Sequence, residues 1–174
     1  MKFFSRIVIC SVLFFSILGA SHAMGQLFMF ENPLVGEKAP DFTLKTADGK
    51  DFDFAKFREN QNTMLFFWAT WCPHCREQLE ELTAAKGKEL EDKGIKILLV
   101  DVEEPANEVN AHIKKHKIPF LVVLDEESTV AEQYKLVGVP TFFFVDKNGM
   151  VRGVEHSLPE NYEEFFGEKL EGKK

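Results

Sequence analysis

The nine residues that organise this chain are Phe67-Trp68-Ala69-Thr70-Trp71-Cys72-Pro73-His74-Cys75. They overlap an apolar run, residues 64–69, whose lack of polar alternation predicts a central strand covered on both faces. A helix that begins at about Pro73 places the Cys72 sulfur over unpaired backbone N–H groups and the positive end of the helix dipole. Both favour the thiolate, so the spacing of Cys72 and Cys75 predicts a reversible disulfide.

The residues beside the two sulfurs are expected to tune them. Pro73 suits the first helical turn because its missing N–H would be unpaired there anyway. A protonated His74 stabilises a neighbouring sulfur anion, so we assign both residues to thiolate tuning. Trp71 abuts Cys72 and is expected to shape the surface around it, whereas Trp68 is expected in the core.

The N-terminus predicts export. Residues 1–23 read as a cleaved signal peptide, in which Lys2 and Arg6 precede an apolar core and Ser21-His22-Ala23 forms a small-residue cleavage site. The core is shorter than the roughly 20 residues that span a bilayer. An uncleaved inner-membrane tether that leaves the protein facing the periplasm is the alternative. Cleavage removes Cys10, the third cysteine of the chain, and leaves two cysteines in one motif.

The mature chain is expected to be one acidic domain. Removing residues 1–23 leaves 151 residues and changes the formal net charge from −7 to −9, because Lys2 and Arg6 are lost. That length suits a single domain with a sizeable core. An acidic chain without a basic patch is a poor candidate for binding nucleic acid or anionic membranes. A purely structural Cys72–Cys75 bridge would close a very short loop and add little stability, so we interpret the pair as redox-active.

Strand and helix patterns alternate along the rest of the chain. After an irregular segment over residues 24–34, the sequence predicts a hairpin of Phe42–Leu44 with Asp51–Phe54. A helix is predicted from Pro73, with a bend near Gly87 and a cap at Gly94. The elements predicted after it are a strand over Ile95–Val100, a helix over Pro105–Lys117, a strand over Phe120–Leu124, a short helix over Ser128–Tyr134 and a hairpin of Phe142–Val145 with Met150–Val154. The last predicted element is a helix that starts at a Ser157–Glu160 capping box and places Tyr162, Phe165, Phe166 and Leu170 on one face. This order predicts one α/β domain over residues 35–174, with helices on both sides of a mixed sheet.

Three blocks of the sequence resemble the thioredoxin fold and, within it, the exported TlpA/ResA-like thiol-disulfide oxidoreductases. Val35–Leu44 is similar to the Gly-x-x-Ala-Pro-Asp-Phe segment of that branch and of the peroxiredoxins. Trp68–Cys75 matches the Trp-x-x-Trp-Cys-x-x-Cys active site, and Gly138–Gly149 matches the segment that carries the cis-proline. The resemblance covers nearly all of the mature chain. It implies a thioredoxin-like fold with an N-terminal β-hairpin and an inserted helix-strand element over Pro105–Leu124.

The same resemblance implies a site and its partners. Cys72 and Cys75 are expected to be catalytic, and the Val139-Pro140 bond is expected to be cis. Trp71, Val139 and Pro140 are expected to bind an extended substrate peptide as an added strand. We expect a monomer without cofactor or metal, which exchanges electrons with protein dithiols and disulfides and is reset by an inner-membrane electron donor. One candidate substrate is the disulfide of an apocytochrome c haem-attachment site.

The direction of electron flow stays open. The Pro73-His74 pair favours a stabilised thiolate, and therefore a relatively oxidising couple that suits a disulfide oxidase or isomerase. Many thioredoxins have a buried aspartate where this chain has Phe66, and TlpA/ResA-like proteins often have a glutamate where it has Gln78. Either acid would help to deprotonate Cys75. The neighbouring Glu77 is not expected to replace them, because we interpret it as a solvated surface acid. The overall architecture makes reduction of exported proteins the first hypothesis.

Parts of the sequence also suggest three other functions. Peroxiredoxins place a threonine or serine three residues before the peroxidatic cysteine and a proline further back, where this chain has Ala69 and Leu65. A metal-binding module could use the two motif cysteines with His112 and His116. However, 36 residues separate the two pairs, against about 12–15 in zinc fingers, and both histidines are expected to be solvated. A non-catalytic interaction domain should show no disulfide-transfer activity.

Overall fold

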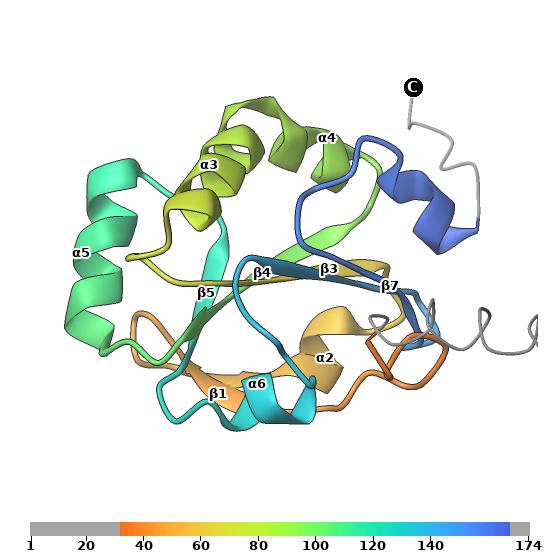
Figure 1. The fold of residues 1–174 in the computed structure, drawn as a ribbon, viewed down its shortest axis with the longest axis horizontal. Coiled ribbons are helices and arrows are strands. Elements are labelled where there is room, and N and C mark those ends of the chain that lie inside the picture. Colours follow the sequence, from red (N-terminus) through yellow and green to blue (C-terminus); the bar gives the residue numbers. More distant parts are fainter. Residues whose placement is uncertain (1–31, 168–174) are drawn as a thin grey trace, which may run out of the picture. The chain divides into compact units, whose positions relative to one another are not determined.

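The computed structural model describes residues 32–167 and contains a mixed sheet with helices on both faces (Figure 1). Its strands are β1 (Thr43–Thr46), β2 (Asp51–Asp53), β3 (Thr63–Trp68), β4 (Lys96–Val102), β5 (Leu121–Asp125), β6 (Thr141–Val145) and β7 (Val151–Glu155). They lie in the order β2-β1-β5-β4-β3-β6-β7. The central strands β5, β4 and β3 are parallel, and the remaining neighbours are antiparallel. The predicted α/β fold with a mixed sheet is confirmed.

Helices cover the two faces unequally (Figure 1). One face carries α3 (Pro73–Glu81), α4 (Gly87–Asp92) and α5 (Ala106–His116), and the other carries α2 (Phe54–Arg58) and α6 (Thr129–Gln133). The predicted signal peptide lies outside the described residues. Within residues 32–167, no helix is long and apolar enough to cross a membrane.

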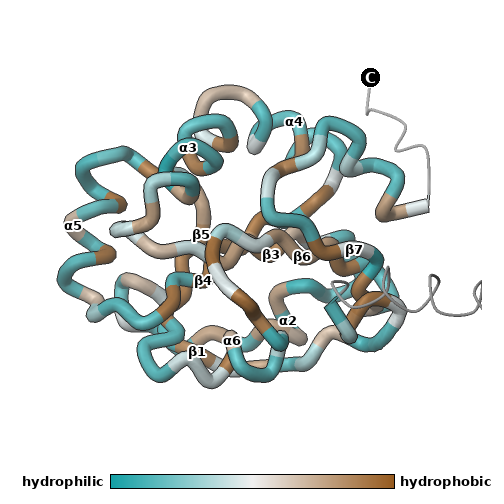
Figure 2. Tube along the Cα trace, viewed as in Figure 1, coloured by the Kyte–Doolittle hydropathy of each residue, from teal (hydrophilic) through white to brown (hydrophobic). Residues whose placement is uncertain are grey.

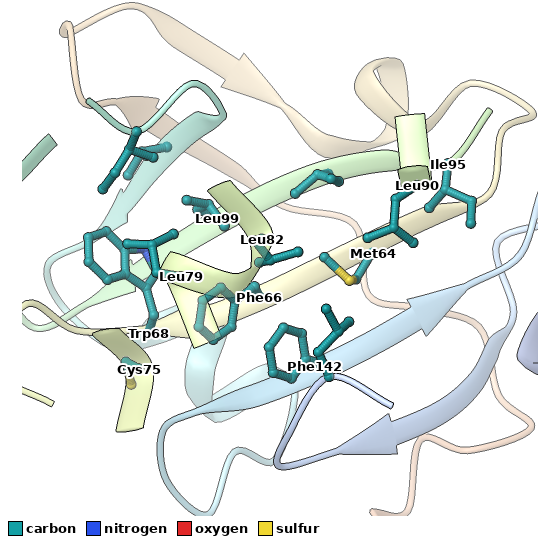
Figure 3. Packing of buried hydrophobic residues seen from close by; sticks show 14 of the residues in the cluster. Met64, Phe66, Trp68, Cys75, Leu79, Leu82, Leu90, Ile95, Leu99 and Phe142 are labelled. Carbon is teal, nitrogen blue, oxygen red and sulfur yellow. The ribbon is translucent and has the colours of Figure 1, made fainter. Parts of the chain in front are cut away.

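Strand β3 runs through the middle of the core. Successive side chains of a strand point to opposite faces, so Phe66 and Trp68 pack with Cys75 beneath α3, while Phe67 packs on the other face. Figure 3 shows the first group, in which Phe66 lies beside Phe142. The centroids of these two rings are 4.3 Å apart. Hydrophobic residues follow the strands, whereas the outer helices are largely hydrophilic (Figure 2). Complete burial of a large apolar side chain such as Phe66 stabilises the fold by about 1.5–3 kcal/mol relative to leaving it exposed.

The long helix after Pro73 is interrupted near the predicted bend. A π-helical turn, η1 (Leu82–Lys86), separates α3 from α4. A Cβ atom on Gly87 would lie 2.3 Å from the ring of Phe120, so only glycine lets the helix approach this side chain. Gly94 has a left-handed φ of 76° just after α4, as the predicted cap requires.

Most predicted elements begin or end one or two residues from their observed bounds, and two predictions are wrong about the kind of element. The second hairpin strand ends at Asp53 rather than Phe54, because the Asp53 carboxylate accepts the Lys56 N–H and starts α2, a short helix that the pattern did not indicate. The Ser157–Glu160 capping box does not begin an α-helix. Instead the 3-10 helix η2 (Tyr162–Phe166) follows Asn161. Packing decides this end of the chain, because Tyr162 and Phe166 are buried in the core. Leu170, which was predicted to extend that face, lies outside the described residues.

Candidate active site

The Cys72 sulfur lies at the amino end of α3. Cys72 is the N-cap residue, its sulfur accepts the backbone N–H of Cys75 at 3.2 Å, and Pro73 opens the helix. A disulfide joins the two cysteines. Cys72 is 4% exposed and Cys75 is completely buried, so only the first sulfur is open to a partner. The placement that the sequence predicted for both sulfurs and for Pro73 is therefore observed.

A loop distant in sequence lies against the disulfide. The Val139-Pro140 bond is cis, which confirms the expectation from the resemblance. The carbonyl oxygen of Val139 is 3.7 Å from the Cys72 sulfur, although 67 positions separate the two residues. The structure therefore brings two of the three predicted peptide-binding residues next to the reactive sulfur.

A groove of about 530 Å³ runs beside this loop and is lined by His74, Glu77, Gln78, Val137–Pro140, His156 and Ser157. Trp71 stands near the disulfide and is 63% exposed, which fits its predicted place on the surface of the site, whereas Trp68 is fully buried as predicted. No sequence signal singled out His156. Its Nδ1 atom is 3.2 Å from the carbonyl oxygen of Pro140 and 3.1 Å from the Thr141 hydroxyl.

The two positions that carry an acid in related proteins are occupied differently. Phe66 stacks on Phe142, and the side-chain oxygen of Gln78 accepts the Leu158 N–H at 2.6 Å. Glu77 is exposed, as expected, and its carboxylate lies 3.3 Å from the His74 ring. Neither Phe66 nor Gln78 supplies a carboxylate to Cys75.

Two acids that the sequence pattern did not single out lie behind the loop that precedes Cys72. Both oxygens of Glu104 accept hydrogen bonds from Thr70, one from its N–H and one from its hydroxyl, each at 2.5 Å. The Arg76 guanidinium donates to the carbonyl of Thr70 at 3.1 Å. Asp101 is completely buried nearby, and burial together with the charge of Glu104 raises its pKa to about 9. The only sequence signal for Asp101 is its position directly after the apolar run of a predicted central strand.

Of the two candidate zinc histidines, His112 packs on the core and His116 faces solvent. The His112 ring lies 5.5 Å from that of Trp68 and 4.2 Å from that of His116. Burial lowers the pKa of His112. His116 is exposed as predicted, whereas the prediction that His112 is solvated is wrong, because its helix lies over the edge of the core. In the described part of the chain, no group of three or more metal-binding side chains is close enough together to hold an ion.

Known proteins are similar to this chain in sequence and in architecture. Residues 35–154 match the sequence model of the AhpC/TSA family. The chain belongs to the AhpC/TSA family. Thiol-disulfide oxidoreductase ResA of Geobacillus thermodenitrificans is similar to this AhpC/TSA-family chain, with 31% identity over 160 residues that span 88% of this chain and 89% of that relative.

Solved structures agree with the AhpC/TSA-family assignment. StoA from Bacillus subtilis is 25% identical and superposes with a TM-score of 0.61, over 76% of this chain and 98% of StoA. A thiol:disulfide interchange protein of the thioredoxin family from Chlorobium tepidum is 26% identical, with a TM-score of 0.63 over 76% of this chain and 95% of the other. The AhpC/TSA-family chain is thus a thioredoxin-like thiol-disulfide oxidoreductase, and the predicted ResA-like resemblance is confirmed.

Proposed function

We propose that this oxidoreductase reduces disulfides in exported proteins, with Cys72 as the attacking residue and Cys75 as the resolving residue. One observation carries the proposal: the Cys72 sulfur caps α3 and accepts the Cys75 N–H, while Cys75 is completely buried. The helix dipole and this hydrogen bond stabilise a thiolate on Cys72. The buried sulfur can react only with a partner that Cys72 has already bound.

The reduced enzyme starts the cycle with a Cys72 thiolate that attacks one sulfur of the substrate disulfide. A bond forms between Cys72 and that sulfur, and the other substrate sulfur leaves as a thiolate that takes up a proton. The Cys75 thiolate then attacks Cys72, forms the Cys72–Cys75 disulfide and releases the second substrate thiolate. Two electrons pass to the substrate, and an external dithiol donor must return them.

The substrate peptide is proposed to bind as an extended strand along the Val139-Pro140 loop. The position of the Val139 carbonyl beside the Cys72 sulfur supports this, because a peptide paired with that backbone would present its disulfide to Cys72. Exposed Trp71 offers an apolar surface next to the same sulfur. His74 and Pro73 are proposed to tune the thiolate from the first turn of α3.

Replacement of Cys75 by alanine tests the assignment of the two sulfurs. The variant is expected to accumulate mixed disulfides on Cys72, since the resolving thiolate is missing. The Cys72→Ala variant is the matched control and should form none. Equal trapping by both variants would contradict the proposed roles.

The physiological substrate and location form a finer part of the proposal. By its likeness to ResA-named relatives, the protein is proposed to act outside the cytoplasm after cleavage of residues 1–23, on targets such as the haem-attachment disulfide of apocytochrome c. Its electron donor would be an inner-membrane protein. Mass spectrometry of the partners trapped by the Cys75→Ala variant in cells, together with the N-terminal sequence of the mature protein, tests both statements.

A disulfide oxidase or isomerase is the second candidate, and the surroundings of Cys75 favour it. Phe66 and Gln78 provide no acid to take the proton from Cys75, which slows the step that completes reduction. The reduction potential of the Cys72–Cys75 pair separates the two functions. A value near the roughly −270 mV of thioredoxin supports the reductase, whereas one near the roughly −120 mV of strongly oxidising relatives supports the oxidase.

A further inference from the structure

Asp101 is a buried acid without a hydrogen-bond donor. It lies at the end of β4, in register with Trp68 of β3, and therefore on the same face of the sheet as Trp68 and Cys75. The residue is 0% exposed, and among the described residues neither of its carboxyl oxygens has a hydrogen-bond partner. An ionised carboxylate in such a place would carry a large desolvation cost.

The neighbouring acid explains why Asp101 can occupy this position. Glu104 is 4% exposed, and both of its oxygens are occupied by donors on Thr70. Burial, followed by the negative charge of Glu104, raises the pKa of Asp101 to about 9. Two nearby carboxyl groups in a low-dielectric interior avoid ionising together, and a proton on Asp101 makes it a donor that Glu104 can accept.

We propose that Asp101 keeps a proton and donates a hydrogen bond through it to Glu104, so that the two side chains position the loop in front of Cys72. Asp101 is thus a positioning residue for the thiol-disulfide exchange. The proposed hydrogen bond links Asp101 to Glu104, and Glu104 in turn accepts hydrogen bonds from Thr70. Thr70 stands two positions before Cys72. Arg76 fixes the same loop from the other side, because its guanidinium donates to the Thr70 carbonyl.

The other charged groups around this pair come from three elements. Glu126 follows β5, and its negative charge also opposes ionisation of Asp101. His112 of α5 lies on the side of Glu104, and the cationic Arg76 of α3 and Lys115 of α5 act on the same histidine. The proton therefore belongs on Asp101.

The proposal predicts how stability depends on pH. The pKa of Asp101 is higher in the folded chain than in the unfolded chain, so the folded state binds more protons between about pH 4 and 9. The stability that comes from this group is fully present below about pH 4 and is lost as pH rises through about 9. Asp101→Asn keeps a donor for Glu104 without titrating. This variant should therefore be more stable than the native protein at neutral pH, by a margin that grows up to about pH 9.

Infrared spectroscopy tests the protonation directly. The full chain at pH 7 should show a protonated-carboxyl C=O band that Asp101→Asn removes. The matched control is Asp125→Asn on the neighbouring strand, because the Asp125 carboxylate is equally buried but accepts the N–H groups of Val130 and Ala131. The control should retain the band. If no band is lost in Asp101→Asn, the proposal is wrong, and since no substrate is involved this result leaves the proposed function untouched.

Exchange kinetics test the positioning role. Asp101→Leu removes the donor and should slow the reaction of Cys72 with a model disulfide by about tenfold at pH 7, because the loop is no longer held in place. Asp101→Asn should restore most of that rate, and Asp125→Asn should not change it. The native protein should also lose exchange rate above about pH 9, where Asp101 ionises beside Glu104, and Asp101→Asn should not. Identical pH profiles for the native protein and Asp101→Asn would overturn the role, even if Asp101→Leu does not fold.

Discussion

The side-chain oxygen of Gln78 accepts a 2.6 Å hydrogen bond from the backbone N–H of Leu158, 80 positions away. This bond joins the helix turn that follows Cys75 to the C-terminal segment. It gives Gln78 a structural partner in place of an acid–base role. A glutamate at this position could accept the same N–H and would add a carboxylate near the resolving sulfur.

We therefore predict that Gln78→Glu speeds the release of substrate from Cys72 by about tenfold, because the new carboxylate takes the proton from Cys75. Rapid-quench measurement of the decay of a mixed disulfide on Cys72 tests this. Glu77→Gln, a change on the exposed side of the same helix turn, serves as the control and should leave the decay unchanged. A Gln78→Glu rate equal to that of the native protein would show that proton removal from Cys75 does not limit release.

The imidazole beside the disulfide should influence the potential of the pair. His74 follows the N-cap sulfur by two positions and lies close to Glu77 on the exposed surface. Replacement by alanine removes an imidazole that stabilises the Cys72 thiolate when it is protonated, so the pair should become more reducing by about 30 mV. Equilibration with glutathione measures the change. His116→Ala, on the exposed end of α5, is the control, and an equal shift in both variants would argue against a local effect of His74.

The C-terminal segment is predicted to depend on the absence of a side chain at Gly153. A Cβ atom there would lie 2.2 Å from the ring of Phe165, which stacks on Phe144 at 4.5 Å. Gly153→Ala should lower the free energy of unfolding by about 1–3 kcal/mol, because Phe165 must leave this position. Urea denaturation measures the loss. Gly138→Ala meets no atom within 4 Å and is the control, and equal losses in the two variants would contradict the steric explanation.

Acid should weaken the attachment of the same segment. The Glu89 carboxylate accepts hydrogen bonds from Lys93 and from the Tyr162 hydroxyl, and these contacts lower the pKa of Glu89 to about 2. Since the folded pKa lies below the unfolded value, this stabilisation is present above about pH 4.5 and is lost as pH falls toward 2.

Glu89→Gln should therefore show a smaller loss of stability between pH 5 and pH 2 than the native protein, as urea unfolding at each pH would measure. Glu91→Gln, an exposed change on the same helix, should keep the native slope. If both variants lose stability in parallel with the native chain, the contact with Tyr162 does not titrate as described.

Local patterns account for most of the elements and for the redox pair. The apolar run before Trp68, the Cys72–Cys75 spacing and Pro73 act through neighbours in the chain, since a strand pleat and a helix N-terminus extend over only a few residues. Phe54 shows the limit of this reasoning. It continues an alternating pattern, yet it begins α2 because the Asp53 side chain caps that helix.

The tertiary structure alone decided which groups surround the sulfurs. Thr70 and Glu104 are 34 positions apart, and Gln78 and Leu158 are 80 apart. Such pairs meet only after β3 and β4 lie side by side and the C-terminal segment packs on the core. The sequence by itself determined that this chain holds a reactive disulfide at a helix N-terminus, because that chemistry is local. Which acids and backbone groups face the disulfide depended on burial and strand order, which no short pattern encodes.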